Sequence, residues 1–232
     1  MSGLRAVLFD VDFTLAKPGP ELGPTGYVRV GERLGMKLDP SRYDEARAHA
    51  IQNLKRHPEL VHDDEIWIVF MAEIVRGMGG DEARAYRCGR ELSRAWSVSA
   101  NFELYEDALP VLEDLRRHEL KIGLVSNTGR DLAEFIVHHG LDVDAAISSG
   151  AHGKVKPDPT IFLAVLRELD VRPERTAMVG DSIDDDVEGA RQLGMSAFLL
   201  DRTASYPDFP DRLPDLYALP AALGLEPRAA PR

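Results

Sequence analysis

Two aspartates separated by one residue, Asp10 and Asp12, stand directly after the apolar run 6–9. Such a run is typical of a buried strand, so both carboxylates are expected where that strand ends. An unpaired charge is costly to bury, and the pair therefore needs a metal ion, a hydrogen-bond network or solvent. Aspartate is also common in turns that follow strands. Taken alone, the pair is consistent with a chemical site or with an ordinary surface loop.

Three further polar segments follow apolar runs that we expect to be strands. They are Ser126-Asn127-Thr128 after 122–125, the segment with Lys156 after 145–147, and 180–186 after 176–179. In open α/β sheets, ligands bind at the carboxyl ends of strands, near the point where the strand order reverses. The carboxylates, hydroxyls, amides and lysine would converge there. These groups suit Mg²⁺ beside a phosphate, because Mg²⁺ prefers oxygen ligands and lysine or hydroxyl donors can hold the remaining phosphate oxygens.

Each segment also has an ordinary structural interpretation. Ser126 could cap the helix that follows it, and Lys156 could be a surface lysine. Residues 181–186 could be an acidic helix N-terminus, which the helix dipole favours. Only the four segments together, in order and each near an expected strand end, point to a site.

The elements that must position these segments alternate after residue 100. Short apolar runs at 122–125, 145–147, 176–179 and 197–200 lie between amphipathic helical patterns at 107–117, 130–139, 158–169 and 184–193. Asp158 and Pro159 are typical of a helix start, and Gly140 of a helix end. Strand–helix alternation with nearly continuous apolar strands predicts an α/β fold with a parallel sheet covered on both faces.

Residues 16–100 do not alternate in this way. Prolines and glycines between 18 and 26 form a breaker-rich linker, and a second breaker region lies near 97–101. Helical patterns follow the first linker at about 25–35, 41–56, 63–77 and 81–96. We therefore expect a helical domain at 16–100, inserted into a sheet domain made of residues 1–15 and 101–232.

Composition narrows the classes of function and partner. The 232 residues include 28 Lys and Arg against 39 Asp and Glu, a formal net charge of -11. That balance disfavours nucleic acid and anionic membrane surfaces as partners. The single cysteine, Cys88, allows no internal disulfide, and no apolar stretch approaches membrane-spanning length. A cytoplasmic protein is the simplest interpretation, and the sequence does not fix its oligomeric state.

In sequence order, the four segments resemble the motifs of the haloacid dehalogenase (HAD) superfamily, over roughly residues 4–202. Asp10–Leu15 resembles the first motif, Ser126 the second, Lys156 the third, and 180–186 the fourth. The resemblance implies a Rossmann-like parallel sheet core with an inserted α-helical cap domain. Phe13 stands where the family often has Gly, and Asp185 where it often has Asn. Lys154 is a second candidate for the third motif, but Lys156 directly precedes Pro-Asp-Pro, as in the family pattern.

The resemblance also implies a mechanism of covalent phosphoryl transfer. Asp10 would attack phosphorus and form an aspartyl-phosphate. Asp12 would protonate the leaving oxygen and then deprotonate the attacking water. Lys156 and Mg²⁺ would offset the repulsion between the nucleophile and the phosphate.

Binding roles follow from the same resemblance. Ser126, the backbone N–H of Asn127 and Lys156 would hold phosphate oxygens, and Thr14 would steady the loop after the nucleophile. The metal would be held by Asp10, Asp181 and the backbone carbonyl of Asp12, and through water by Asp186, with Asp185 as the alternative outer ligand.

The expected function is therefore Mg²⁺-dependent hydrolysis of a small phosphorylated metabolite. Asp12 argues against dehalogenation, because the dehalogenase branch lacks that second Asp. A phosphomutase, or a non-catalytic binding relative, remains an alternative. The cap would recognise the leaving group; its candidate residues, which are equally consistent with solvated helix surface, are Arg47, His49, Lys55, Arg56 and His57.

Overall fold

The computed structural model describes residues 3–54 and 57–226, and the chain divides into two units. The first unit comprises the residues up to Lys17 and those from Leu104 onward. The second unit is Pro18–Glu103. Lys55 and Arg56, two of the expected cap candidates, lie outside the described residues.

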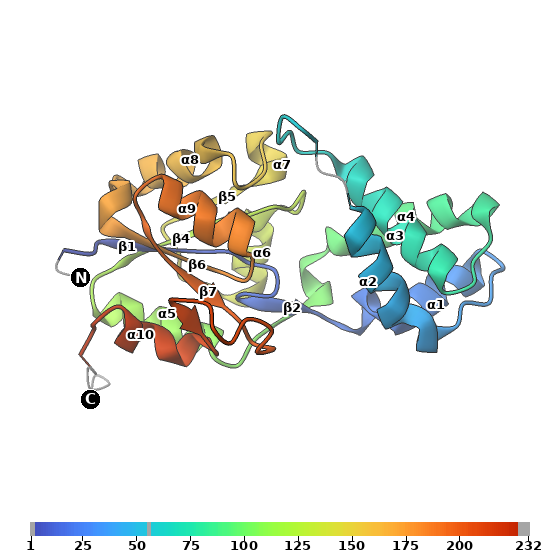
Figure 1. Ribbon diagram of the computed structural model, residues 1–232, viewed down its shortest axis with the longest axis horizontal. Coiled ribbons are helices and arrows are strands. Elements are labelled where there is room, and N and C mark those ends of the chain that lie inside the picture. The colour runs from blue at the N-terminus through green and yellow to red at the C-terminus, as the bar shows by residue number, and fades with distance from the viewer. Residues whose placement is uncertain (1–2, 55–56, 227–232) are drawn as a thin grey trace. The chain divides into compact units, whose positions relative to one another are not determined.

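A parallel sheet of six strands lies at the centre of the first unit as it is described (Figure 1). Its order is β5-β4-β1-β6-β7-β8, with β1 Ala6–Phe9, β4 Lys121–Ser126, β5 Ala145–Ser148, β6 Thr176–Gly180, β7 Ser196–Leu200 and β8 Arg212–Leu213. In register, Ala6 of β1 lies opposite Lys121 of β4 on one side and Thr176 of β6 on the other. The chain builds outward from β1 to β4 and β5, then returns to the other side of β1. The strand order therefore reverses beside β1, where a ligand site is expected.

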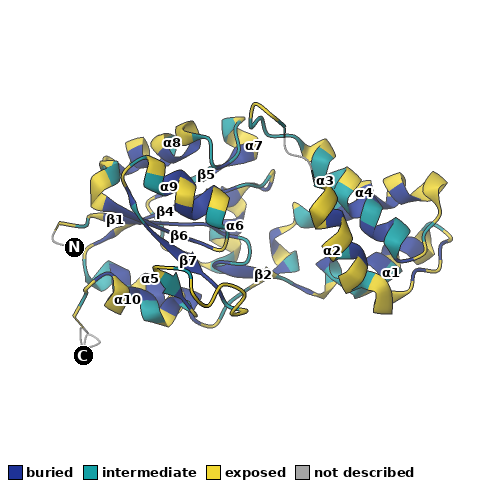
Figure 2. Cartoon of the chain, in the orientation of Figure 1, coloured by how far each residue is buried: buried dark blue, intermediate teal, exposed yellow. Residues whose placement is uncertain are grey.

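Helices cover both faces of this sheet, as the sequence predicts. Figure 1 shows α8 and α9 on one face and α5 and α10 on the other. The helices of this unit are α5 Ala108–Arg117, α6 Leu132–His139, α7 Ser149–His152, α8 Pro159–Leu169, α9 Gly189–Gln192 and α10 Leu219–Ala222, with 3₁₀ turns at Pro173–Arg175 and Leu216–Ala218. In Figure 2 the strands are buried and the helices expose their outer sides. The α/β fold class with a parallel sheet is confirmed.

Local signals explain where several of these helices begin and end. Asp158 caps α8 by accepting a hydrogen bond from the Thr160 backbone N–H at 2.9 Å, and Pro159 takes the first helical position. Gly140 ends α6 in the left-handed conformation, with φ of 64°. Ile161, Phe162 and Val165 of α8 are wholly buried and pack in one cluster with strand residues such as Leu8 and Met178.

The helix expected at 184–193 is present over 183–192, but its first part is not α-helical. The chain instead forms a π-helix, η5, over Ile183–Glu188 and only then the short helix α9. Asp186 and Val187 both donate their backbone N–H to the Ser182 carbonyl, at 3.1 and 3.2 Å. The wider turn carries one extra residue, so the helical periodicity assumed from the sequence does not hold there.

The second unit is helical, with α1 Pro24–Arg33, α2 Tyr43–Asn53, α3 Asp64–Gly77 and α4 Glu82–Trp96, and with 3₁₀ turns at Pro20–Leu22, Pro40–Arg42 and Ser99–Asn101. Its core includes Tyr27, Met71, Ile74 and Leu92. A Cβ at Gly89 would lie 2.5 Å from the Ile68 carbonyl oxygen, so glycine allows α3 and α4 to approach closely. The segments that connect the two units, β2 Ala16–Pro18 and β3 Phe102–Leu104, form a separate two-stranded sheet. Among the described residues, no helix has the length and apolar character needed to cross a bilayer.

Candidate active site

The loop after β1 presents Asp10 at the carboxyl end of the central strand. The Asp10 backbone N–H donates to the Val179 carbonyl at 2.9 Å, which ties this end of β1 to β6. The chain then turns back on itself, because Leu15 and Ala16 both donate to the Val11 carbonyl, at 2.9 and 3.0 Å. Within this turn Phe13 has φ of 66°, a left-handed conformation that glycine adopts without strain. The conformation explains why glycine suits this position, where the sequence has Phe.

Lys156 joins two of the expected site segments directly. Its ammonium donates to Asp10 Oδ1 and to Asp186 Oδ1, each at 2.6 Å, and to the Val125 carbonyl at 2.9 Å. The side chain is only 2% exposed. Burial alone would lower the pKa of Lys156, but the charges of Asp10 and Asp186 outweigh burial and raise that pKa above its usual value. Lys156 is therefore a fixed positive charge between two carboxylates.

The π-helix η5 sets the position of Asp186. Its Oδ2 accepts a hydrogen bond from the Ser182 backbone N–H at 3.0 Å, and the residue is 1% exposed. A Cβ at Gly180 would lie 2.2 Å from Asp186 Oδ2, so only glycine leaves room for this carboxylate against the end of β6. Gly180 and the π-turn together bring Asp186 to the edge of the sheet.

Three carboxylates form a potential metal-binding group. Asp10, Asp181 and Asp186 each offer an oxygen, and these oxygens lie within 4.8 Å of one another. Burial, together with the charges of Asp186 and Asp181, raises the pKa of Asp10 well above its usual value, although Lys156 opposes the effect. The pKa of Asp181 is raised to about 7, first by desolvation and then by the charge of Asp186. Because Asp181 is exposed, water screens part of that effect.

This donor set fits Mg²⁺. A hard divalent cation takes oxygen ligands and is commonly held by few carboxylates together with waters and phosphate oxygens. Besides burial, the neighbouring carboxylates raise the pKa of Asp10 and of Asp181, which indicates a site with too little positive charge for its three acids. A cation would supply that charge.

Asp12 lies beside the group of three, but its carboxylate has a different partner. Its Oδ1 accepts a hydrogen bond from Arg130 Nη2, and its side chain is 18% exposed. Desolvation raises the pKa of Asp12, and the Arg130 charge opposes the increase. The expected metal contact through the Asp12 backbone carbonyl stays a prediction.

Asn127 holds the backbone of Lys156 rather than pointing its side chain at the acidic group. Its Oδ1 accepts from the Lys156 backbone N–H at 2.7 Å, and its Nδ2 donates to the Lys156 carbonyl at 3.2 Å. Nδ2 also donates to Asp185 Oδ2 at 3.4 Å. Asp185 therefore contacts Asn127, whereas Asp186 belongs to the acidic group. Ser126 is buried at the end of β4, and its phosphate contact, like that of the Asn127 N–H, stays a prediction.

The end of the loop after β1 is held by an arginine that the sequence analysis missed. Arg202 Nη2 donates to the Thr14 carbonyl at 2.9 Å. The same guanidinium makes two hydrogen bonds to the Asp107 carboxylate, at 2.8 and 2.9 Å, and lies 3.8 Å from the Tyr105 ring centroid. The Thr14 hydroxyl is buried and has no hydrogen-bond partner among the described residues. Arg202 follows β7 at the same edge of the sheet, which was the available signal.

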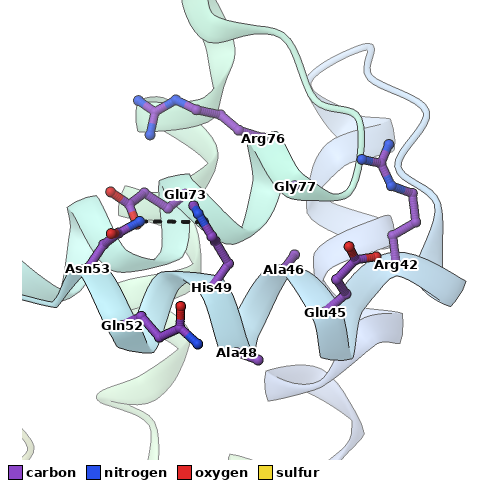
Figure 3. A pocket seen from close by; sticks show the side chains of 10 residues that line it. All are labelled: Arg42, Glu45, Ala46, Ala48, His49, Gln52, Asn53, Glu73, Arg76 and Gly77. Atoms are coloured by element: carbon purple, nitrogen blue, oxygen red, sulfur yellow. Dashed lines mark hydrogen bonds between the residues drawn. The ribbon is translucent and has the colours of Figure 1, made fainter.

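A hollow of about 660 Å³ lies within the second unit (Figure 3). It is lined by residues of α2 and α3 and of the turn before α2: Arg42, Glu45, Ala46, Ala48, His49, Gln52, Asn53, Glu73, Arg76 and Gly77. His49, an expected cap candidate, makes a hydrogen bond with Asn53 at 3.4 Å. Arg47 and His57, the other described candidates, do not line it.

Comparison with known proteins gives consistent matches. A family model described as haloacid dehalogenase-like hydrolase matches residues 4–194. Phosphoserine phosphatase from Thermus thermophilus is 37% identical over 148 residues, which are 62% of this chain and 57% of that protein, so the chain matches little more than half of that relative. Glyceraldehyde 3-phosphate phosphatase from Methanopyrus kandleri is 28% identical over 91% of this chain and 90% of that protein. The crystal structure of a HAD phosphatase from Thermococcus onnurineus superposes with a TM-score of 0.66 at 29% identity, covering 96% of this chain and 99% of that one.

Proposed function

The chain belongs to the haloacid dehalogenase-like hydrolases, and on that premise we propose that it is a Mg²⁺-dependent phosphatase of small phosphomonoesters. One observation carries the proposal. The Lys156 ammonium bonds Asp10 and Asp186, and both belong to a group of three carboxylates with the composition of a Mg²⁺ site. The proposed nucleophile, the candidate cation site and a fixed positive charge are thus adjacent at the edge of one sheet.

Asp10, Asp181 and Asp186 would hold the metal. Bound there, Mg²⁺ would neutralise charge on the carboxylates and on the phosphate and polarise the phosphorus–oxygen bonds. Lys156 would act in the same direction, because its ammonium already lies against Asp10 and can hold a phosphate oxygen brought to that carboxylate.

The nucleophile is assigned to Asp10. A bond forms between an Asp10 oxygen and phosphorus while the bond from phosphorus to the leaving oxygen breaks. The leaving oxygen takes a proton from Asp12, whose carboxyl group has a raised pKa. A water molecule then attacks phosphorus and gives a proton to Asp12, while the bond between the Asp10 oxygen and phosphorus breaks and inorganic phosphate is released. Ser126 and the Asn127 N–H would bind phosphate oxygens during both steps.

The substrate is proposed only as a class. Two of the relatives are named for phosphoserine and for glyceraldehyde 3-phosphate, which share a small alcohol part and a single phosphate group. The helical second unit, Pro18–Glu103, would act as the cap that recognises this alcohol part. Arg47, His49 and His57 remain candidates for that recognition.

The test is phosphate release from a panel of small phosphomonoesters, with and without Mg²⁺. Asp10→Asn is expected to abolish release, because the amide cannot act as the nucleophile. Asp170→Asn is the matched control: it makes the same change at the exposed end of α8, where the backbone is left-handed and Asn is tolerated. Metal-independent release, or release that survives Asp10→Asn with deamidation excluded by mass spectrometry, would contradict the proposal. Transfer of phosphate within a substrate without release would indicate a mutase.

A further inference from the structure

We propose that Arg130 is a positioning residue that holds the carboxyl group of Asp12 for proton transfer, an inference that rests on the proposed phosphatase function. Arg130 lies between β4 and α6, in a segment that the motif comparison did not single out. Its side chain is wholly buried, and its Nη2 donates to Asp12 Oδ1. The two residues are 118 positions apart in the sequence, so the contact is made by the fold.

The surroundings of Arg130 restrict its movement. Its guanidinium carbon lies 4.8 Å from the centroid of the Phe135 ring, which is itself wholly buried on α6. The Arg130 backbone N–H donates to Thr128 Oγ1 at 3.2 Å. Asp131 caps α6 by accepting from the Ala133 backbone N–H at 2.8 Å. The start of α6 and the buried Phe135 ring therefore restrict the movement of the guanidinium.

Burial and charge distinguish this role from phosphate binding. A wholly buried guanidinium that is bonded to a carboxylate presents no exposed nitrogen to a substrate. A buried charged pair is also not the most stable way to fill a core, because apolar residues of similar volume often do as well or better. The partner of Arg130 is the group that the proposed mechanism needs as acid and base. Because Arg130 bonds Oδ1, we assign proton transfer to Oδ2.

A positioning role predicts a selective kinetic defect in Arg130→Met, which keeps much of the aliphatic volume and removes the hydrogen bond. Phosphoenzyme formation from an alkyl phosphate needs a proton on the leaving oxygen, whereas p-nitrophenolate leaves without one. We expect kcat/KM to fall about 100-fold for an alkyl phosphomonoester, within the range of general acid catalysis, and to change less than about 3-fold for p-nitrophenyl phosphate. Aspartyl-phosphate should then accumulate, because water attack also needs Asp12, giving a burst of p-nitrophenolate.

The experiment compares four proteins on both substrates: the wild type, Arg130→Met, Asp12→Asn and the double variant. Arg167→Met, at an exposed position on α8, controls for the substitution itself. If Arg130 acts through Asp12, its substitution adds less than about 3-fold to the Asp12→Asn defect. Arg130→Lys, which keeps a buried positive charge, takes the place of Arg130→Met if that variant does not fold. It should show the same selectivity with a smaller loss.

Equal losses on the alkyl and aryl substrates in a folded Arg130 variant would overturn the inference, and so would losses that multiply with Asp12→Asn. Failure of the proposed function has a different signature. In that case the wild type releases no phosphate from either substrate, or Asp12→Asn itself shows no preference for the aryl substrate.

Discussion

Two polar regions of this protein carry charged side chains, and they differ in burial and in pairing. At the carboxyl edge of the sheet, Lys156 and Asp186 are almost wholly buried and bonded to each other. In the hollow of the second unit, His49 and Glu45 are exposed, and Arg76 pairs with the exposed Glu82. Buried charges must be stabilised by charged and hydrogen-bonding partners within the protein, whereas exposed charges are stabilised by water. We therefore expect catalysis at the sheet edge. Residues of the hollow are expected to affect substrate binding at most.

Among the changes that compare the two regions, Lys156→Met is expected to have the largest effect. Removing the ammonium leaves Asp10 and Asp186 without their shared positive charge, so phosphate release should fall at least about 100-fold, the scale of a lost electrostatic contact to the transition state. Lys154→Met is the matched control and should reduce turnover less than about 3-fold, within the scatter of surface changes. Steady-state kinetics on the best substrate of the panel measures both. An equal loss of turnover in the two variants would show that Lys156 contributes no more to catalysis than Lys154.

The next prediction concerns the contribution of the Arg202–Asp107 pair, which lies at the sheet edge, to the stability of the protein. In Asp107→Asn, Arg202 loses its charged partner and its hold on the Thr14 carbonyl is weakened. Breaking such a pair should lower the free energy of unfolding by about 3 kcal/mol. Asp114→Asn, which breaks the short-range pair with Arg117 on α5, should cost less than about 1 kcal/mol. Urea unfolding of both variants gives the comparison, and similar losses would show that burial does not distinguish the two pairs.

A smaller effect concerns the pH dependence of stability without metal. The pKa of Asp181 is raised to about 7, so between its usual value and 7 the folded state binds more protons than the unfolded state. Stability of the metal-free protein is then greatest at low pH within this window and is lost as the pH rises to 7. Mg²⁺ should therefore raise the Tm more at pH 8 than at pH 5.5, because protons compete with it at the lower pH. Thermal unfolding in Mg²⁺ and in EDTA measures the difference. A larger Mg²⁺ shift at pH 5.5 would contradict the assignment.

The smallest effect is expected in the hollow. His49→Ala removes a side chain whose hydrogen bond to Asn53 is long and exposed, so the free energy of unfolding should change by less than about 0.5 kcal/mol. Its kcat should stay within about 2-fold of the wild type, and any change should be in KM. Kinetics and urea unfolding test this. A large fall in kcat would show that the hollow takes part in catalysis and would contradict the contrast between the two regions.

Much of the fold could be predicted from the sequence, because the signals for strands and helix ends are local. Apolar runs mark the central strands, and Asp158 with Pro159 and Gly140 mark the ends of two helices. The motif residues lie at strand ends, and parallel strands bring their carboxyl ends to one edge. This is why Asp10 and Asp186 could be expected near each other before any distance was known.

The features that could not be predicted depend on tertiary contacts. Arg130 reaches Asp12 across 118 positions and Arg202 reaches Thr14 across 188, and neither pairing leaves a local pattern. Gly180 leaves room for Asp186 of the π-helix η5, and a run of three aspartates has no periodicity that would reveal the π-turn. The two-residue strand β8 is too short to carry an alternating pattern.

The proposed function requires Asp10 to be the nucleophile of a phosphoryl transfer at this sheet edge. The most direct measurement is to mix enzyme, Mg²⁺ and the best phosphomonoester, quench within one turnover in acid, and locate phosphate on the digested protein by mass spectrometry. We expect phosphate on the peptide that contains Asp10, with fragmentation assigning it to that residue, and none in Asp10→Asn. Full turnover with no phosphorylated peptide at any quench time, or with phosphate on another residue, would contradict it.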